Sequence, residues 1–210
     1  MDYATPTRFN ELCRRLGVAD MSARNIFADL ASHYTEDHRK YHNLSHIDRM
    51  LGWLDATGES IDSVELAIWF HDVVYNPLGS HNESMSARYF RDRLGTFIPG
   101  PFADTVERLI LATDLTRTRT GSDVENLIID IDLSILGASP EDYAAYRNAI
   151  RCEYSAVPED KFIAGRRSIL LGFLSQRIYS TDYFEQLERQ ARANIQVELE
   201  SLETSPHNRA

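Results

Sequence analysis

Residues 41–54 read YHNLSHIDRMLGWL, and this stretch decides how the rest of the chain is interpreted. Its apolar residues recur at intervals of three and four, as they do on one buried face of an α-helix: Leu44, Ile47, Met50, Leu51 and Leu54. The spacing predicts a helix that opens near Asn43. It also places His42 and His46 one turn apart on a common side of that helix.

Helical periodicity continues outward from this stretch in both directions, and Gly, Pro and Ser/Thr/Asp clusters stand where helices should end. We expect helices over about 7–16, 22–34, 82–94, 106–113, 123–136, 158–176 and 181–202, one that ends at the pair His71-Asp72, and one that begins at Ser139-Pro140. The β-branched residues of 123–136 leave a strand open there, although the spacing favours a helix. The sequence predicts an all-α fold, with a single domain over 1–203 and a disordered tail at 204–210.

Composition excludes several classes of protein. The chain has 210 residues, 43% of them hydrophobic, which is enough for a substantial core. Its formal net charge of −10 argues against a surface that binds DNA or RNA, because such surfaces are usually basic. Cys13 and Cys152 form neither a disulfide framework nor a zinc motif, and the apolar runs are too short to span a membrane. We expect a reduced, cytoplasmic protein that acts without a membrane partner.

Histidines and acids gather in a pattern that is typical of a metal site. Residues 70–75 read FHDVVY, and Asp130 and Asp132 lie in an otherwise apolar run. Burial of these carboxylates is costly unless a cation or hydrogen-bond donors compensate them. Imidazole and carboxylate ligands suit one divalent ion such as Mn, Fe, Co, Ni or Zn, with Mg as an alternative. A metal-dependent hydrolase is therefore the leading hypothesis.

Four motifs carry a more specific resemblance. They are YHNLxHI at 41–47, FHDxVY at 70–75, NExxSA at 82–87 and DxDLxILG at 130–137. With these motifs the chain resembles the HD-domain superfamily of metal-dependent phosphohydrolases, and within it a small group of predicted bacterial enzymes. The resemblance implies a helical HD domain with additional C-terminal helices. It also implies cleavage of a phosphate ester or anhydride in a small, nucleotide-like substrate, and it leaves open which of these bonds is cleaved.

The resemblance assigns roles to individual residues. The metal ligands would be His46, His71, Asp72 and Asp132. His42 would be either an additional ligand or a residue that orients one, and Asp130 is the alternative to Asp132. Related proteins often have a histidine soon after the position of Thr113, where this chain has Asp114, so we expect a single ion.

The resemblance also suggests residues for the chemistry. A metal ion would lower the pKa of a bound water and polarise a phosphoryl oxygen, while Asp72 or Glu83 handles the proton. Glu83 has an equally good alternative interpretation, as a first-turn acid that complements a helix dipole. Arg39, Asn82 and Tyr75 are candidates for contact with the substrate. For Arg39, a solvated loop position is the alternative.

Two other classes of function remain open at this point. The chain could be a catalytically silent protein that keeps the HD scaffold for binding or regulation. An HD-fold iron oxygenase is a further alternative, although such chemistry generally needs two iron ions and the histidine supply after Thr113 is thin. In either case a homodimer is compatible with the sequence, and fold alone does not decide among these functions.

Overall fold

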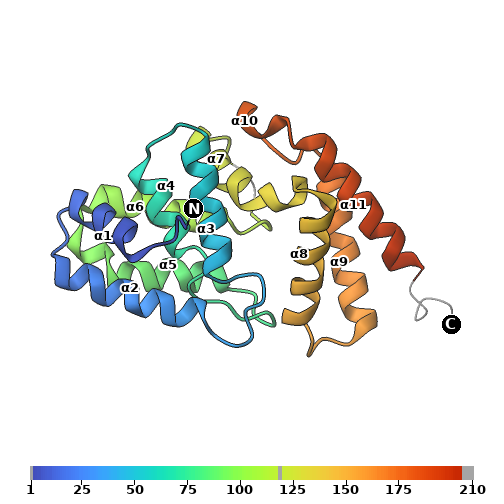
Figure 1. Cartoon of the computed structure of the whole chain (residues 1–210), viewed down its shortest axis with the longest axis horizontal. Helices are drawn as coiled ribbons and strands as arrows, with labels where there is room; N and C mark the ends of the chain where they lie inside the picture. The colour runs from blue at the N-terminus through green and yellow to red at the C-terminus, as the bar shows by residue number, and fades with distance from the viewer. Residues whose placement is uncertain (1, 118–119, 205–210) are drawn as a thin grey trace. The chain divides into compact units, whose positions relative to one another are not determined.

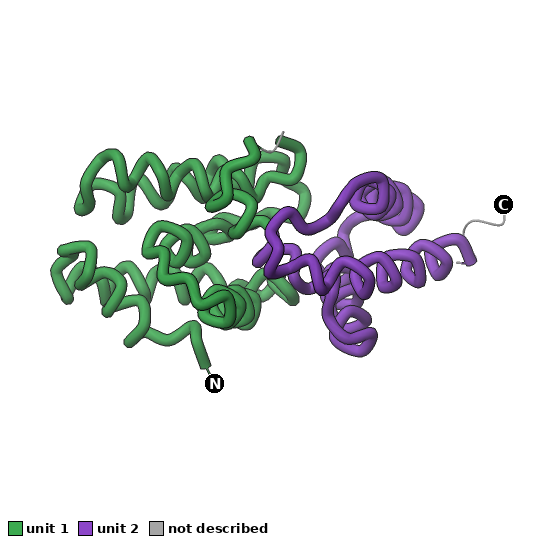
Figure 2. The backbone as a smooth tube through the Cα atoms, turned by 90° about the horizontal axis from the view of Figure 1, so that it is seen from above, with its two compact units in different colours: residues 1–129 green, residues 130–210 purple. Residues whose placement is uncertain are grey.

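Every element in the described residues of this computed structural model, 2–117 and 120–204, is a helix, which confirms the predicted all-α fold (Figure 1). The backbone divides into two compact units, residues 1–129 and residues 130–210 (Figure 2). The single domain over 1–203 stays a prediction. The predicted tail at 204–210 lies, apart from Thr204, outside the described residues.

Over its described residues, the first unit contains six α-helices, one short 3₁₀ helix and most of a seventh α-helix. Their bounds are α1 (Pro6–Arg15), α2 (Asp20–Tyr34), α3 (Leu44–Ala56), α4 (Asp62–Phe70), α5 (Asn82–Arg93), η1 (Gly95–Phe97), α6 (Gly100–Ala112) and α7 (Asp123–Asp132). Most of these bounds agree with the sequence prediction to within two residues. Helix α6 begins six residues earlier than expected, because Pro101 is well tolerated in the first turn of a helix.

Helix α4 forms the centre of the first unit. It packs against α3, α5 and α6, and its residues from Ser63 to Phe70 are all buried. Trp69 meets the rings of Phe9 and Phe27 edge to face, with centroid distances of 5.4 and 5.9 Å. Aromatic pairs of this geometry stabilise a core beyond their buried area alone. His71 and Asp72, which directly follow α4, are therefore attached to a well-packed helix.

Helix α3 begins at a defined cap. Asn43 is extended, and its side chain accepts a hydrogen bond from the backbone N–H of Ser45 at 2.9 Å. This is the usual way in which Asn satisfies a free N–H at a helix start. His46 is consequently the third residue of α3, whereas His42 precedes the helix. The two histidines are therefore not both on α3, although their ring centroids lie 5.8 Å apart.

The second unit is built from η2 (Leu133–Gly137), α8 (Pro140–Glu153), α9 (Glu159–Leu174), α10 (Asp182–Glu185) and α11 (Glu188–Glu203). Helix α11 packs against η2 and α9, and α8 packs against η2. A Cβ atom on Gly137 would lie 2.6 Å from Leu187 Cβ, so only glycine allows this approach.

Two predicted helices are interrupted in the structure. The helix expected over 123–136 changes to 3₁₀ form at Leu133, whose carbonyl oxygen accepts a hydrogen bond from the hydroxyl of Tyr179 at 3.0 Å. The helix expected over 181–202 is divided into α10 and α11. At the start of α11, Glu188 accepts hydrogen bonds from the N–H groups of Ile178 and Tyr179. The first interruption coincides with a contact between residues 46 positions apart, and the second with contacts nine and ten positions apart.

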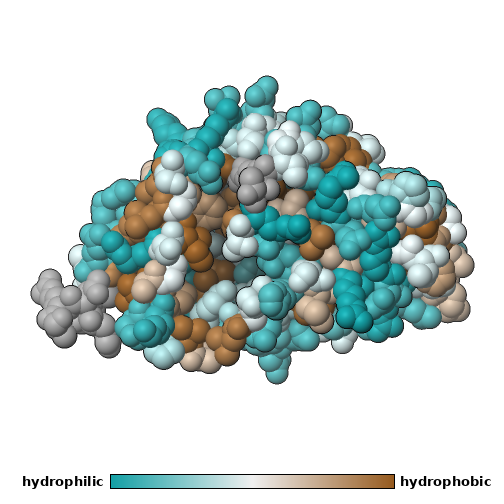
Figure 3. Space-filling view, turned by 180° about the vertical axis from the view of Figure 1, so that it is seen from behind, coloured by the Kyte–Doolittle hydropathy of each residue, from teal (hydrophilic) through white to brown (hydrophobic). Residues whose placement is uncertain are grey.

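The surface shows no continuous apolar belt on the face seen in Figure 3, where hydrophilic residues surround separate hydrophobic patches. Among the described helices, none combines the length and the apolar character that a bilayer crossing requires.

Candidate metal centre

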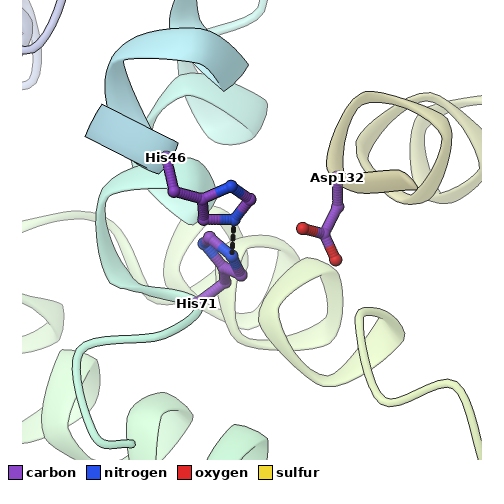
Figure 4. A group of neighbouring side chains, drawn as sticks. All are labelled: His46, His71 and Asp132. Carbon is purple, nitrogen blue, oxygen red and sulfur yellow. Dashed lines mark hydrogen bonds between the residues drawn. The ribbon is translucent and has the colours of Figure 1, made fainter. Parts of the chain in front are cut away.

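Two buried histidines meet at the ends of neighbouring helices. His46 lies in the first turn of α3 and His71 is the C-cap of α4, and each is only 1% exposed. Their Nε2 atoms are 3.2 Å apart (Figure 4). Because α3 packs against α4, this pair belongs to the rigid part of the first unit.

The proton on His71 is fixed by the backbone. Its Nδ1 lies 3.0 Å from the carbonyl oxygen of Ile68, and a carbonyl oxygen can only accept. Nδ1 therefore carries the proton, and in the neutral ring Nε2 presents a lone pair. A backbone carbonyl in this place is a common way to orient a metal-binding histidine.

Asp72 adds a third lone-pair atom to the pair of histidines. Its Oδ2 lies 3.0 Å from His71 Nε2 and 3.8 Å from His46 Nε2. Two donors bound to one ion at about 2.1 Å lie roughly 3.0 Å apart at a right angle and about 3.4 Å apart at the tetrahedral angle. The three atoms have nearly this spacing, so the residues present fit a divalent ion.

Asp132 completes a group of side chains that can hold a metal ion. It is the last residue of α7, a continuous helix that begins in the first unit at Asp123. His46, His71 and Asp132, the three side chains drawn in Figure 4, could hold a metal ion, because one ligand atom of each lies within 4.8 Å of the others. The predicted divalent metal site therefore has a physical basis at these residues.

The Asp72 carboxyl is held in its ionised form. Burial would raise its pKa, but attraction to His71 and a hydrogen bond with it act in the opposite direction, and His42 and His46 add to the lowering. The net result is a pKa well below the usual range of a carboxyl. An ionised Asp72 is suited to binding a cation and is a poor acceptor for a proton.

The pKa of Glu83 is shifted in the opposite direction to that of Asp72. Glu83 lies in the first turn of α5, and burial raises its pKa above the ordinary value of 4.5. A hydrogen bond from its own backbone N–H and the nearby His71 lower the pKa, whereas the carboxylates of Asp114 and Asp72 raise it further. A carboxyl with a raised pKa exchanges protons more readily near neutral pH.

Asp130 has a structural role. It is fully buried, and its carboxylate accepts hydrogen bonds from the N–H of Ser180, from the N–H of Thr181 and from the hydroxyl of Thr181 at distances from 2.7 to 3.0 Å. These donors compensate the buried charge. Of the two carboxylates that the sequence offered, Asp132 belongs to the metal-type group and Asp130 anchors the loop before α10.

His42 and Tyr75 pack against each other next to the histidine pair. Their ring centroids are 4.3 Å apart, and the ring of His42 lies 5.8 Å from that of His46. His42 also lowers the pKa of Asp72, so it influences the site electrostatically. It does not belong to the group of three in Figure 4, and its role as an additional ligand stays a prediction.

Arg39 differs from both interpretations that the sequence suggested. Its side chain is completely buried, so it does not lie in a solvated loop. Its guanidinium donates to the carbonyl oxygens of His42, Asp72 and Val73 and to the carboxylate of Glu36. These four acceptors use the N–H donors of the guanidinium that would otherwise bind a phosphate.

The turn after Asp72 is fastened by α5. Asn82 exchanges two hydrogen bonds of 3.0 Å with the backbone N–H and carbonyl of Asn76. Ser86, one helical turn later, accepts from the N–H of Val74 at 3.1 Å and donates to its carbonyl at 3.3 Å. Sequence reasoning missed Ser86, although its spacing of four residues from Asn82 in the NExxSA motif was the available signal.

In comparisons with known proteins, no family model, no curated protein and no solved structure matches the chain.

Proposed function

We propose that this protein is a metal-dependent phosphohydrolase that uses one divalent ion to cleave a phosphate ester or anhydride in a small, nucleotide-like substrate. His46, His71, Asp72 and Asp132 would hold the ion. When bound, such an ion lowers the pKa of a water molecule and polarises a phosphoryl oxygen. The native ion would be Mn, Fe, Co, Ni or Zn, with Mg as the alternative.

One observation carries the proposal. His71 Nδ1 donates to the carbonyl oxygen of Ile68, so Nε2 is the ring atom that lies 3.0 Å from Asp72 Oδ2 and 3.2 Å from His46 Nε2. A proton on Nε2 makes the contact with Asp72 a charge-assisted hydrogen bond, which is the state that lowers the pKa of Asp72. In the neutral ring a metal ion would take the place of that proton, and the convergence of His46 Nε2, His71 Nε2 and Asp72 Oδ2 supports a site for one.

The two candidate catalytic carboxyls divide the work in this proposal. Asp72, with its lowered pKa, stays ionised and binds the cation. Glu83, with its raised pKa, is the better group to take a proton from the attacking water or to deliver one to the leaving oxygen. A raised pKa in one carboxyl beside a lowered pKa in another is a recurrent arrangement in acid–base catalysis.

The test is product analysis by chromatography. Purified protein is incubated with nucleoside mono-, di- and triphosphates, cyclic nucleotides and dinucleotides, each with Mn, Co, Ni or Mg. The variant Asp72→Ala removes a proposed ligand, and Asp37→Ala removes a carboxylate at an exposed position as the matched control. We expect turnover of at least one substrate by the wild-type protein and by Asp37→Ala, and none by Asp72→Ala.

Two outcomes would contradict the proposal. Equal turnover by the wild-type protein and Asp72→Ala would remove the histidine–aspartate cluster from the chemistry. A lack of turnover with every substrate and metal would favour either a binding protein or an oxygen-dependent reaction of the same cluster.

A further inference from the structure

Arg39 joins the two segments that carry the proposed ligands. On one side its Nη1 donates to the carbonyl oxygen of His42 at 3.0 Å, in the segment that leads into α3. On the other side Nη1 and Nη2 donate to the carbonyl oxygens of Asp72 and Val73 at 2.7 and 2.8 Å, in the turn that follows α4. One guanidinium thus spans both segments.

The side chain is held in one orientation. Its Nε donates to Glu36 at 2.9 Å, and its guanidinium lies 5.2 Å from the ring centroid of Tyr34 and 5.5 Å from that of Tyr75. A planar fork with five donors can reach several acceptors at fixed angles, whereas an ammonium group is a single point of charge. Cation–π contacts with these two rings add to this fixed geometry.

The acceptors are carbonyl groups beyond the helices. His42 precedes α3, and Asp72 and Val73 follow the C-cap of α4, so their carbonyls lie outside the regular hydrogen bonding of these helices. Buried carbonyl groups need donors. A cation near the C-terminus of α4 is also favoured by the helix dipole.

We propose that Arg39 is a positioning residue that sets the spacing between His46 and the His71-Asp72 pair, and that the protein needs it for metal affinity rather than for substrate contact. This inference rests on the proposed function, because it takes the cluster to be a metal site. Residues that orient metal ligands typically contribute about 10- to 100-fold to metal affinity.

The test is titration of the full-length, metal-free protein with Co²⁺, followed by its visible absorption spectrum. Arg39→Lys keeps the charge but cannot reach all three carbonyls, so we expect about tenfold weaker Co²⁺ binding. We also expect a changed spectrum at saturation, because the ligand geometry around the cation differs. A residue with a purely structural role would lower stability without changing that spectrum.

Arg8→Lys is the matched control. Arg8 also links α3 to α4, through Asp55 and Glu65, and these contacts lie far along both helices from the ligands. We expect this variant to bind Co²⁺ as the wild-type protein does. Should Arg39→Lys fail to fold, Glu36→Gln takes its place, since it loosens Arg39 from a half-buried partner and should weaken binding to a smaller extent.

The outcomes separate this inference from the proposed function. Wild-type affinity and spectrum in Arg39→Lys, or in Glu36→Gln where it replaces that variant, would contradict the role of Arg39 alone. The same is true if Arg8→Lys loses as much affinity as Arg39→Lys, because the loss would then follow stability. Absence of Co²⁺ binding by the wild-type protein would overturn the proposed metal site, and the inference with it.

Discussion

Two buried groups of charges in this protein are compensated in different ways. In the second unit, the carboxylate of Glu198 accepts hydrogen bonds from Arg166 on both oxygens and from the hydroxyl of Tyr143. In the first unit, Nε2 of His46, Nε2 of His71 and Oδ2 of Asp72 converge at distances from 3.0 to 3.8 Å. The carboxylate of the first group is paired with donors of the protein, whereas the second group gathers ligand atoms that could also hold a cation.

This difference separates structure from function among buried charges. A carboxylate that is fully paired with donors holds helices together, as Glu198 of α11 does with Arg166 of α9 and Tyr143 of α8. A cluster of nitrogen and oxygen ligand atoms on packed helices can instead hold a cation. Such clusters are where a ligand is expected.

The largest effect should follow from removal of a proposed ligand. We expect His71→Ala to lower metal binding from about one ion per chain to none, because three lone-pair atoms no longer converge. The measurement is metal content by elemental analysis after dialysis against Mn²⁺ or Co²⁺. His81→Ala is the control, since His81 is exposed and outside the cluster. Equal metal content in both variants would show that the His71 cluster does not bind the metal, and the two buried groups would then not differ in this respect.

The next effect concerns the complete group in the second unit. Arg166→Met leaves the carboxylate of Glu198 buried without its main partner, and a broken buried pair costs about 3–5 kcal/mol of unfolding free energy. Arg167→Met removes an exposed pair with Glu203 and should cost about 1 kcal/mol or less. Urea unfolding measures both losses. Equal losses in the two variants would show that burial does not determine how much the pair Arg166–Glu198 stabilises the protein.

Asp130 and Asp132 show the same difference between a structural and a metal-binding carboxylate, although they are only two residues apart. Asp130→Asn weakens charge-assisted hydrogen bonds to Ser180 and Thr181, which are worth about 1.5–3 kcal/mol. It should lower stability and leave metal affinity unchanged. Asp132→Asn should do the reverse, with weaker binding of Co²⁺ and little change in the urea midpoint. A loss of metal affinity in Asp130→Asn as large as in Asp132→Asn would contradict this division.

Asp130 and Asp132 also show how much of the structure could be predicted from the sequence. Patterns of apolar residues and caps predicted most helices, because features such as Asn43 before α3 and Ser139-Pro140 before α8 act through neighbouring residues. The separate roles of Asp130 and Asp132 were not predictable. They depend on where the N–H groups of Ser180 and Thr181 lie, some fifty residues along the chain.

Arg39 illustrates the same limit within the candidate site. The resemblance to the HD-domain superfamily implied His46, His71, Asp72 and Asp132 as ligands, and three of these, His46, His71 and Asp132, form a group that could hold a metal ion. The acceptors of Arg39 in the turn after α4 are 33 and 34 residues away, so local pattern could not show that its charge is buried. Tertiary contacts decide whether an arginine near a site faces substrate or supports the backbone.

The smallest expected effect is a pH dependence at Glu83. Its folded-state pKa is raised, so its contribution to stability is fully present below the ordinary value of 4.5 and is lost as the pH rises through the folded pKa. Glu83→Gln removes this loss. In metal-free protein, the stability of the variant relative to the wild-type protein should therefore increase between pH 4 and pH 7, as urea unfolding at each pH would measure.

Glu59→Gln removes a carboxyl from an exposed position and serves as the control, with no such increase expected. If Glu83→Gln and Glu59→Gln give the same pH profile, Glu83 is not set apart by its surroundings. The interpretation of Glu83 as a first-turn acid that only complements the dipole of α5 would then be the better one, because that role favours the ionised form. A distinct profile would instead support Glu83 as the group that exchanges a proton beside an ionised Asp72.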